Sequence, residues 1–256
     1  MFALEALQAR DGDCLLLHYG SDQDRKLILI DGGPTGTYKS ILKTRLDQLR
    51  GTGTLDLRLA IVSHIDLDHI TGILDLLKNL YELQNSGKPQ PYRIRSLWHN
   101  SFEKLAGVKK AAVENKAVGA AVSGSPIALA GLKDKVKAVV ASVKQGSELR
   151  NYAIQLGIKL NAETKGELVC TPVTGRKIIP IDLDAGLTFT IVGPREGELQ
   201  DLENEWEKSK ARAKAKATPQ AIAADYLNRT VPNLSSIVIL AELKTGGSKP
   251  KQMLLT

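Results

Sequence analysis

The chain has 256 residues, of which 43% are hydrophobic and 25% charged, a composition typical of a globular protein with a sizeable core. Aromatic residues make up only 4%, which argues against a surface that stacks nucleic-acid bases. The formal net charge of +7 favours anionic partners such as nucleic acid, acidic lipid or a charged substrate. The apolar runs are far too short to span a membrane and no signal-peptide pattern opens the chain, so we expect a cytoplasmic protein.

The first hundred residues alternate between strand and helix patterns. A hairpin is expected around the turn signal Asp11-Gly12. Further strands are expected over 25–33, 57–64 and 93–101, and helices over 37–50 and 70–84. The run at 57–64 is almost continuously apolar, as in a central strand that is covered on both faces. This order of elements predicts an α/β protein, with a sheet covered by helices.

The remainder of the chain changes character twice. Residues 102–157 are rich in Ala, Lys, Val and Gly with helical spacing, which predicts a helical insertion. Short strands are expected within 166–194, a charged helix over 195–217, and a closing hairpin across Gly246-Gly247. The five basic residues within 208–216 fit a solvated helix better than a dedicated phosphate contact. Cys14 and Cys170 are expected to be ordinary thiols, as is usual in the cytoplasm.

The stretch "SHIDLDHITG" carries four side chains of the types that bind metals, and they stand at the end of the apolar strand 57–64. They are His64, Asp66, Asp68 and His69. Alternate residues of an extended segment point the same way, so the first two can converge on one cation. The other two stand where a helix begins and can face a second cation nearby. Imidazole and carboxylate groups both suit Zn²⁺ and Mn²⁺.

A purely structural interpretation exists for each of these residues. Asp68 could cap the helix that follows, and a histidine at a strand end is often part of a polar turn. Four such residues within six positions, at the strand end where α/β sites usually lie, favour a metal loop.

This loop resembles a motif of the metallo-β-lactamase superfamily, His-x-His-x-Asp-His, with Asp66 in place of the second histidine. That variant is similar to the hydrolase-like domain of bacterial DNA-uptake channel proteins. The upstream "LILIDGG" matches the first motif of the superfamily, in which Asp31 supports the metal loop, although a simple turn at Gly32-Gly33 is the alternative. The resemblance implies an αββα sandwich spanning 1–256, with the segment 102–157 inserted in it.

The resemblance also implies a dinuclear centre of Zn²⁺ or Mn²⁺. His64 and Asp66 would bind the first ion, and Asp68 and His69 the second, with Asp66 favouring Mn²⁺. Asp68 and His99 are the candidate catalytic residues. His99 lies at the same rim of the expected sheet, although a structural role for it is equally open. His18 is expected to be structural.

Relatives complete the centre with a bridging Asp, which follows a Gly after the last strand, and with a final His. The sequence ends at Thr256, before such a Gly-Asp. We therefore expect the family domain to be incomplete, and a C-terminal fragment or a second chain to supply the remaining ligands.

Three functions follow as hypotheses. The first is a metal-dependent hydrolase, with a nuclease or phosphodiesterase favoured by the positive charge and the DNA-processing relatives, and lactam, thioester or lactone hydrolysis as alternatives. The second is a non-catalytic binding or assembly subunit with half a metal site. The third is a nuclease of antiviral defence, switched by cutting or by assembly.

Overall fold

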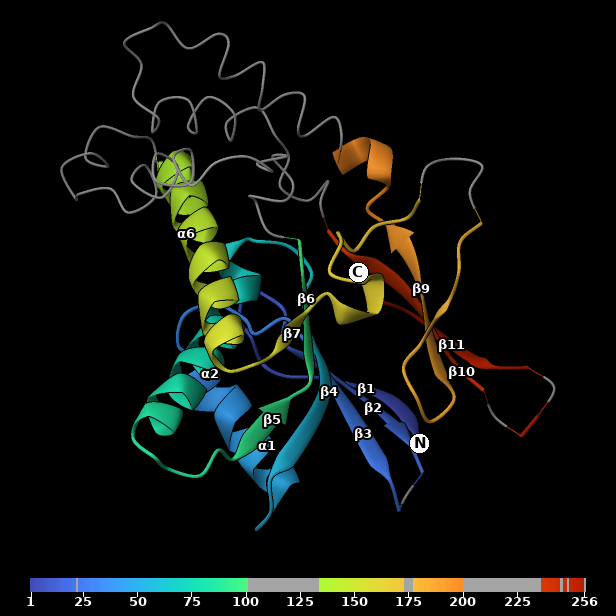
Figure 1. The fold of residues 1–256 in the computed structure, drawn as a ribbon, viewed down its shortest axis with the longest axis horizontal. Coiled ribbons are helices and arrows are strands. Elements are labelled where there is room, and N and C mark those ends of the chain that lie inside the picture. Colours follow the sequence, from blue (N-terminus) through green and yellow to red (C-terminus); the bar gives the residue numbers. More distant parts are fainter. Residues whose placement is uncertain are drawn as a thin grey trace, which may run out of the picture.

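The computed structural model describes residues 1–21, 23–100, 134–172, 177–199, 236–244, 246–247 and 249–255. Within them two β-sheets lie face to face, and the helices pack on the outer side of the larger sheet (Figure 1). The larger sheet holds β1 (Phe2–Ala6), β2 (Leu15–Gly20), β3 (Arg25–Ile30), β4 (Leu55–Val62), β5 (Tyr92–Ile94), β6 (Ser96–His99) and β7 (Lys159–Leu160). The smaller sheet holds β8 (Ile181–Asp182), β9 (Leu187–Gly193), β10 (Val238–Leu243) and β11 (Lys251–Leu255).

The strand order of the larger sheet is β1-β2-β3-β4-β6-β7, with β5 beside the start of β4. The first three strands are antiparallel, whereas β3, β4 and β6 run parallel and end at the same edge. A loop that follows β3 therefore meets a loop that follows β4. The smaller sheet is antiparallel throughout, in the order β11-β10-β9-β8.

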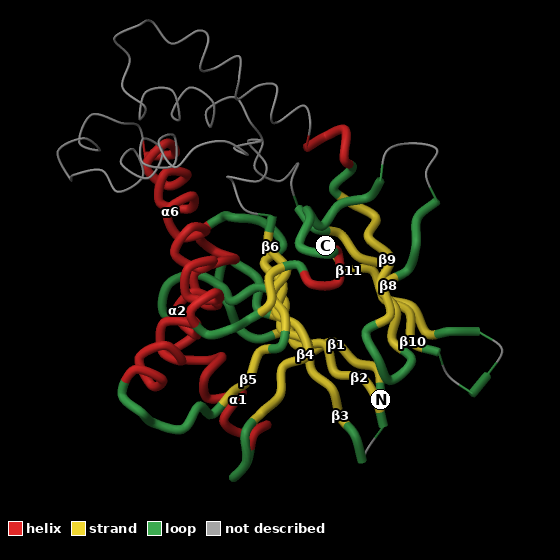
Figure 2. Tube along the Cα trace, in the orientation of Figure 1, coloured by secondary structure: helices red, strands yellow, loops and turns green. Residues whose placement is uncertain are grey.

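The three longer helices among the described residues derive from segments between strands of the larger sheet. They are α1 (Lys43–Arg50), preceded by a π-helical turn over Tyr38–Leu42, α2 (Leu67–Asn85) and α6 (Asp134–Gln155). Helices α2 and α6 lie side by side (Figure 1), and Thr71 of α2 donates a hydrogen bond to Gln145 of α6 at 3.0 Å. Figure 2 shows the resulting three layers of helices, larger sheet and smaller sheet.

Two apolar cores separate these layers. Strand β4 contributes to both, because alternate residues of a strand point to opposite faces. Leu59 and Ile61 pack toward the smaller sheet, against Phe189 among others, while Ala60 and Val62 pack toward the helices. This double burial explains why the sequence of β4 is almost continuously apolar.

An ionic network ties the two sheets together beside the second core. Arg58 of β4 contacts Glu163 at 2.8 Å and Asp184, in the turn between β8 and β9, at 3.2 Å. Glu163 also accepts hydrogen bonds from Trp98 and Ser96. These bonds satisfy a carboxylate whose side chain is only 10% exposed.

The expected order of strands and helices in the first hundred residues is confirmed, with two differences. Helix α2 begins at Leu67 rather than near Ile70. The expected strand at 93–101 is divided into β5 and β6, which pair with β4 in the same register on either side of Arg95.

Farther along the chain the closing hairpin is confirmed as β10 and β11. Of the short strands expected within 166–194, β8 and β9 form, whereas over 166–172 there is only a single bridge between Thr171 and Arg195. This segment is a loop that is held by Asn100, whose side chain exchanges two hydrogen bonds with the backbone of Val169.

Part of the predicted helical insertion, 102–157, is described, and it is helix α6. Its residues Leu149 and Ala153 are buried in the core between the helices and the larger sheet. Residues 102–133 and most of the predicted helix 195–217 lie outside the described residues, so the limits of the insertion stay a prediction. Among the residues that the structure describes, no helix is long and apolar enough to cross a membrane.

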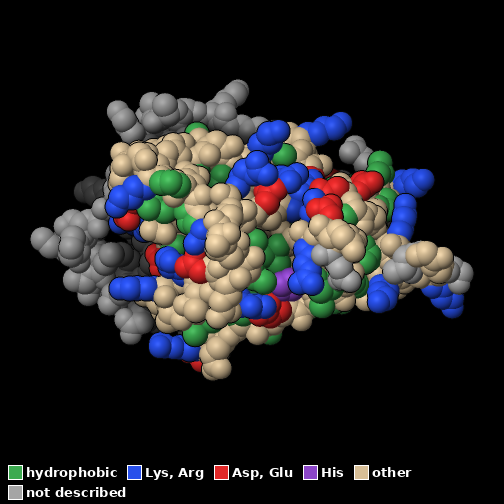
Figure 3. Space-filling view, turned by 90° about the horizontal axis from the view of Figure 1, so that it is seen from below, with side chains coloured by type: hydrophobic (Ala, Val, Ile, Leu, Met, Phe, Trp, Pro, Cys, Tyr) green, Lys and Arg blue, Asp and Glu red, His purple; other side chains and the backbone are tan. Residues whose placement is uncertain are grey.

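The distribution of charge on one face bears on the choice of partner. Viewed from below, Lys and Arg side chains are spread over the surface, with Asp and Glu side chains between them (Figure 3). An uninterrupted basic patch of the kind that tracks a nucleic-acid backbone is not seen on the described part of this face. The net charge of +7 is therefore not concentrated there.

Candidate metal centre

The candidate centre lies at the carboxyl ends of β3 and β4, where Asp31 follows one strand and Ser63 the other. Asp31 is 1% exposed, and its backbone N–H donates to the carbonyl of Ile61 at 2.8 Å. Its φ of 56° turns the chain sharply at the strand end, in a region that Asp tolerates better than most residues. The turn aims the Asp31 carboxylate at the metal loop rather than along the sheet.

The Asp31 carboxylate accepts three hydrogen bonds from that loop. Its Oδ1 accepts from the backbone N–H of Ser63 at 2.8 Å. Its Oδ2 accepts from the hydroxyl of Ser63 at 2.6 Å and from Nδ1 of His69 at 2.9 Å. The Ser63 hydroxyl also contacts Nδ1 of His64 at 3.0 Å. The buried carboxylate of Asp31 thus contacts His69 directly and His64 through the hydroxyl of Ser63.

These contacts determine which ring nitrogen carries a proton. An ionised Asp31 can only accept, so Nδ1 of His69 must be the donor. The single hydroxyl proton of Ser63 goes to Asp31, so the serine oxygen accepts from Nδ1 of His64. Both neutral rings therefore carry the proton on Nδ1, and both leave the lone pair of Nε2 available for a cation.

Each available nitrogen has a carboxylate beside it. Nε2 of His64 lies 3.6 Å from Oδ2 of Asp66, and Nε2 of His69 lies 3.6 Å from Oδ2 of Asp68. Two ligands of one tetrahedral cation are about 3.4 Å apart when each bond is about 2.1 Å long. The four residues therefore form two imidazole–carboxylate pairs whose spacing fits divalent cations.

The two pairs are close to one another, because the ring centroids of His64 and His69 are 3.9 Å apart. This proximity shows in the pKa values of the rings. Burial, with the nearby charge of His69, lowers the pKa of His64. Burial alone would also lower the pKa of His69, but the hydrogen bond to Asp31 and the surrounding carboxylates outweigh it and raise that pKa. The lowered pKa favours the neutral form of His64, the form that binds a cation, whereas the raised pKa of His69 means that a cation at that ring competes with a proton.

Close backbone packing holds the two strand-end loops together. The N–H of Gly32 donates to the carbonyl of His69 at 2.8 Å, and the N–H of Gly72 donates to the carbonyl of Gly33 at 3.0 Å. A Cβ atom on Gly72 would lie 1.8 Å from the carbonyl oxygen of Gly32. Only glycine permits this approach, which sets the distance between Asp31 and the metal loop.

The alternative in which Asp68 caps helix α2 is not observed. Asp66 occupies the N-cap position, with an extended backbone and no capping hydrogen bond from its side chain, and Asp68 lies in the first turn. Neither carboxylate is therefore used to cap the helix. This removes the structural alternative for Asp68 and leaves both groups facing the histidines.

Sequence reasoning missed one acidic residue at this centre, Asp13. Asp13, Asp31 and His69 bring ligand-type atoms within 4.8 Å of one another, a grouping that can hold a metal ion. Oδ2 of Asp13 lies 3.9 Å from Nδ1 of His69. The signal in the sequence was weak, because Asp13 belongs to a turn 50 residues before the metal loop, and Asp-Gly turns are common in hairpins.

The other two histidines are placed differently. His99 pairs in register with Val62, beside the metal loop, but its side chain is buried, with 4% exposure. A Cβ atom on Gly146 of α6 would lie 3.3 Å from Nε2 of His99, so this ring faces that helix. The catalytic role of His99 stays a prediction.

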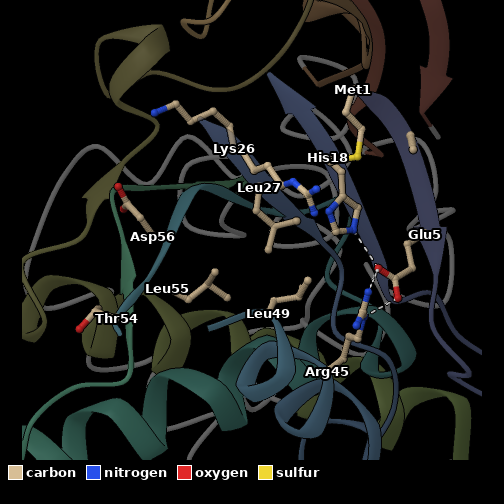
Figure 4. Close-up of a pocket in the computed structure, with 12 residues that line it drawn as sticks. Met1, Glu5, His18, Lys26, Leu27, Arg45, Leu49, Thr54, Leu55 and Asp56 are labelled. Carbon is tan, nitrogen blue, oxygen red and sulfur yellow. Dashed lines mark hydrogen bonds and ion pairs between the residues drawn. The ribbon is translucent and has the colours of Figure 1, made fainter. Parts of the chain in front are cut away.

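His18 lies away from the centre. Figure 4 shows it beside Glu5 and Arg45, in a cavity of about 560 Å³ that also includes Lys26 and Leu55, near the starts of β3 and β4. Glu5 contacts His18 at 2.8 Å and Arg45 at 2.7 Å. The imidazole of His18 is therefore engaged by a carboxylate that also pairs with an arginine. This arrangement agrees with the expected structural role of His18.

The described layers and the paired imidazoles and carboxylates define a class: a mixed α/β protein consistent with the metallo-β-lactamase fold, with a group of side chains able to hold a metal ion. In agreement, residues 8–82 match the family model described as the Metallo-beta-lactamase superfamily. The match includes Asp31, the whole metal loop and most of α2. No curated protein matches the chain. Members of this superfamily are generally hydrolytic metalloenzymes that bind divalent metals such as zinc, which suggests a metal-dependent hydrolase.

Proposed function

We propose that the protein is a phosphodiesterase or nuclease that depends on divalent cations, Zn²⁺ or Mn²⁺, held by His64, Asp66, Asp68 and His69. The observation that carries the proposal is the set of contacts that join Asp31 to Ser63 and the two histidines, from which we infer that Nε2 of each histidine is available beside a carboxylate. A turn with a purely structural role does not require two imidazole–carboxylate pairs whose histidine ring centroids are 3.9 Å apart. The presence of Asp66 where the usual motif has histidine makes the centre richer in oxygen and favours Mn²⁺.

In this proposal each residue of the centre has a distinct role. The carboxylates of Asp66 and Asp68 and Nε2 of the two histidines hold the cations, while Asp31 keeps the Nδ1 proton of His69 in place. Cations bound there would lower the pKa of a water molecule and offset the negative charge that develops on a phosphodiester. Hydrolysis then forms one P–O bond to the water oxygen and breaks one P–O bond to the leaving alcohol, which takes up a proton.

A phosphodiester is preferred among the substrates of the fold because of charge. The net charge of +7 attracts a polyanion over long range. The similarity of the His-x-Asp-x-Asp-His loop to that of DNA-uptake proteins supports the same choice. The described face of Figure 3, with its mixed charges, argues that the substrate approaches from another side.

The resemblance suggests that a later Asp and His complete the centre, and their delivery by a C-terminal fragment or a second chain is part of this proposal. A natural role in antiviral defence is a further hypothesis that rests on the nuclease activity.

The test is hydrolysis of bis(p-nitrophenyl) phosphate, single-stranded DNA and RNA with Mn²⁺ or Zn²⁺, with and without a polypeptide that carries the Gly-Asp and His. We expect activity that requires the cation and is lost in Asp68→Ala. The matched control is Asp11→Asn, an exposed acid in the turn next to the centre.

Two results would redirect the proposal. Cation binding without hydrolysis of any phosphodiester would favour the binding or assembly role. Hydrolysis of a lactam, thioester or lactone in its place would keep the metal-dependent hydrolase and overturn the choice of substrate.

A further inference from the structure

The turn between β1 and β2 packs against the metal loop, and the two backbone segments are in close contact at Gly12. A Cβ atom on Gly12 would lie 1.9 Å from the carbonyl oxygen of Asp68 and 2.9 Å from its Cβ atom. Only glycine allows the turn to come this close to the first turn of α2. The turn is therefore seated directly on one of the candidate cation ligands.

Asp13 is fixed by its two neighbours. Gly12 lies against Asp68, and its N–H donates to the carbonyl of Ala9 at 3.1 Å. Cys14 is 1% exposed within the core between sheet and helices, and its carbonyl accepts from the N–H of Leu7 at 2.9 Å. The backbone of Asp13 is thus held at both ends, and its side chain emerges at the metal loop.

The side chain of Asp13 carries a carboxylate and is not confined by packing. The Asp13 carboxylate is 53% exposed, and its Oδ2 lies 3.9 Å from the ring of His69. It belongs to the one group of three ligand-type residues found among those the structure describes, Asp13, Asp31 and His69. Nδ1 of His69 is engaged by Asp31 at 2.9 Å, so a cation shared by Asp13 and His69 would bind Nε2 of that ring, which lies 3.6 Å from Oδ2 of Asp68.

We propose that Asp13 is an additional carboxylate ligand of the metal centre, supplied by the turn between β1 and β2. This inference rests on the proposed metal centre and extends its ligand set by one residue outside the metal loop. A second carboxylate ligand beside His69, in addition to Asp68, makes that position harder, so the centre discriminates further toward Mn²⁺ and against softer ions. It also means that the N-terminal hairpin takes part in metal binding rather than only in the fold.

The first experiment measures Mn²⁺ binding to the full chain by isothermal titration calorimetry. Asp13→Asn is isosteric and removes only the charge, so we expect the Mn²⁺ affinity to fall about tenfold or more. Asp11→Asn, a residue of the same turn, is the matched control and should bind as the unchanged chain does. Thermal unfolding in the absence of metal should be the same for all three proteins.

The second experiment separates a ligand from a neighbouring charge. In Asp13→Cys a thiolate takes the place of the carboxylate, and soft Cd²⁺ should then bind more tightly and give a thiolate-to-cadmium absorption band in the ultraviolet. Asp11→Cys keeps the native cysteines and should give no such band. A band in the first variant alone supports direct ligation.

Each outcome decides. If the unchanged chain binds Mn²⁺ and Asp13→Asn binds it within threefold, or if Asp13→Cys gives no cadmium band, Asp13 is not a ligand while the proposed function stands. If the unchanged chain binds no cation, either alone or with the polypeptide that carries the Gly-Asp and His, both proposals fail together. If both metal results are as expected but no phosphodiester is hydrolysed, the ligand assignment stands and the proposed function fails.

Discussion

The hydroxyl of Ser63 donates a hydrogen bond to Oδ2 of Asp31 at 2.6 Å, and this bond connects the buried acid to His64. Without the hydroxyl, Nδ1 of His64 has no partner to hold its proton, and the ring is free to turn or change tautomer. In the proposed centre the serine would therefore help to orient a cation ligand, although its own side chain is not a ligand.

We predict that Ser63→Ala lowers the affinity for Mn²⁺ about tenfold, the size usually found when a group that orients a ligand is lost. Isothermal titration calorimetry on the two proteins measures this. Ser40→Ala removes an exposed hydroxyl that bonds only to the carbonyl of Gly36 and serves as the control. Equal affinity in all three proteins would show that Ser63 does not orient His64.

Asp31→Asn tests the proton arrangement itself. Asparagine tolerates the positive φ at this position and preserves the shape of the side chain, so the fold should persist. Its amide group donates where the carboxylate accepted, which forces Nδ1 of His69 to become the acceptor and moves the ring proton to Nε2.

The expected result is a loss of Mn²⁺ affinity of about 10–100-fold, with a near-native circular dichroism spectrum. The ring tautomer of His69 can be read from ¹⁵N chemical shifts of the imidazole. An unchanged tautomer in Asp31→Asn would contradict the assignment.

Gly72→Ala should destabilise the protein although alanine favours a helix more than glycine does. The new methyl group would collide with the carbonyl oxygen of Gly32, at 1.8 Å, and push apart the two loops that form the centre. We expect a loss of about 1–3 kcal/mol in the free energy of unfolding, as for an overpacked core, together with weaker Mn²⁺ binding.

Chemical denaturation measures that loss, and Gly53→Ala is its control. At Gly53 the nearest heavy atom to a Cβ would be the Arg50 carbonyl oxygen at 3.9 Å, so the added methyl group meets ordinary space. Equal stability of the two variants would mean that the loops can separate without cost.

The bond between Arg58 and Glu163 predicts a dependence of stability on pH. Burial by itself would raise the pKa of Glu163, but the hydrogen bonds from Arg58, Trp98 and Ser96 outweigh it and lower the pKa below the usual 4.5. A carboxyl group whose pKa is lowered on folding stabilises the protein above its unfolded pKa, and that contribution disappears as the pH falls through the folded value.

Glu163→Gln should therefore cost about 3 kcal/mol at pH 7, because it removes one partner of a buried pair. The difference between the two proteins should be constant at neutral pH and shrink below about pH 4.5, the region of the unfolded carboxyl pKa. Urea denaturation from pH 3 to pH 7 measures both. Glu242→Gln is the control, because Glu242 is only half-buried and its carboxylate accepts a hydrogen bond from Gln252.

The sequence alone was sufficient for the elements that have a strong period or a distinctive end. The second half of strand β4, residues 59–62, is continuously apolar because it is buried on both faces, and "SHIDLDHITG" directly after it concentrates the ligand types in one loop. Its weaker predictions were those for short segments, such as the loop around Val169, which is held by Asn100 from 69 residues away. Local patterns carry no information on such distant hydrogen bonds.

Only the tertiary structure decided how the centre is organised. Asp31 and His69 are 38 residues apart, and the parallel pairing of β3 with β4 brings them within 2.9 Å. The proton positions on the two rings follow from that contact and from Ser63, not from the loop sequence. The turn that carries Asp13 reaches the metal loop because Gly12 has no side chain, a close approach that depends on packing between elements rather than on any local pattern.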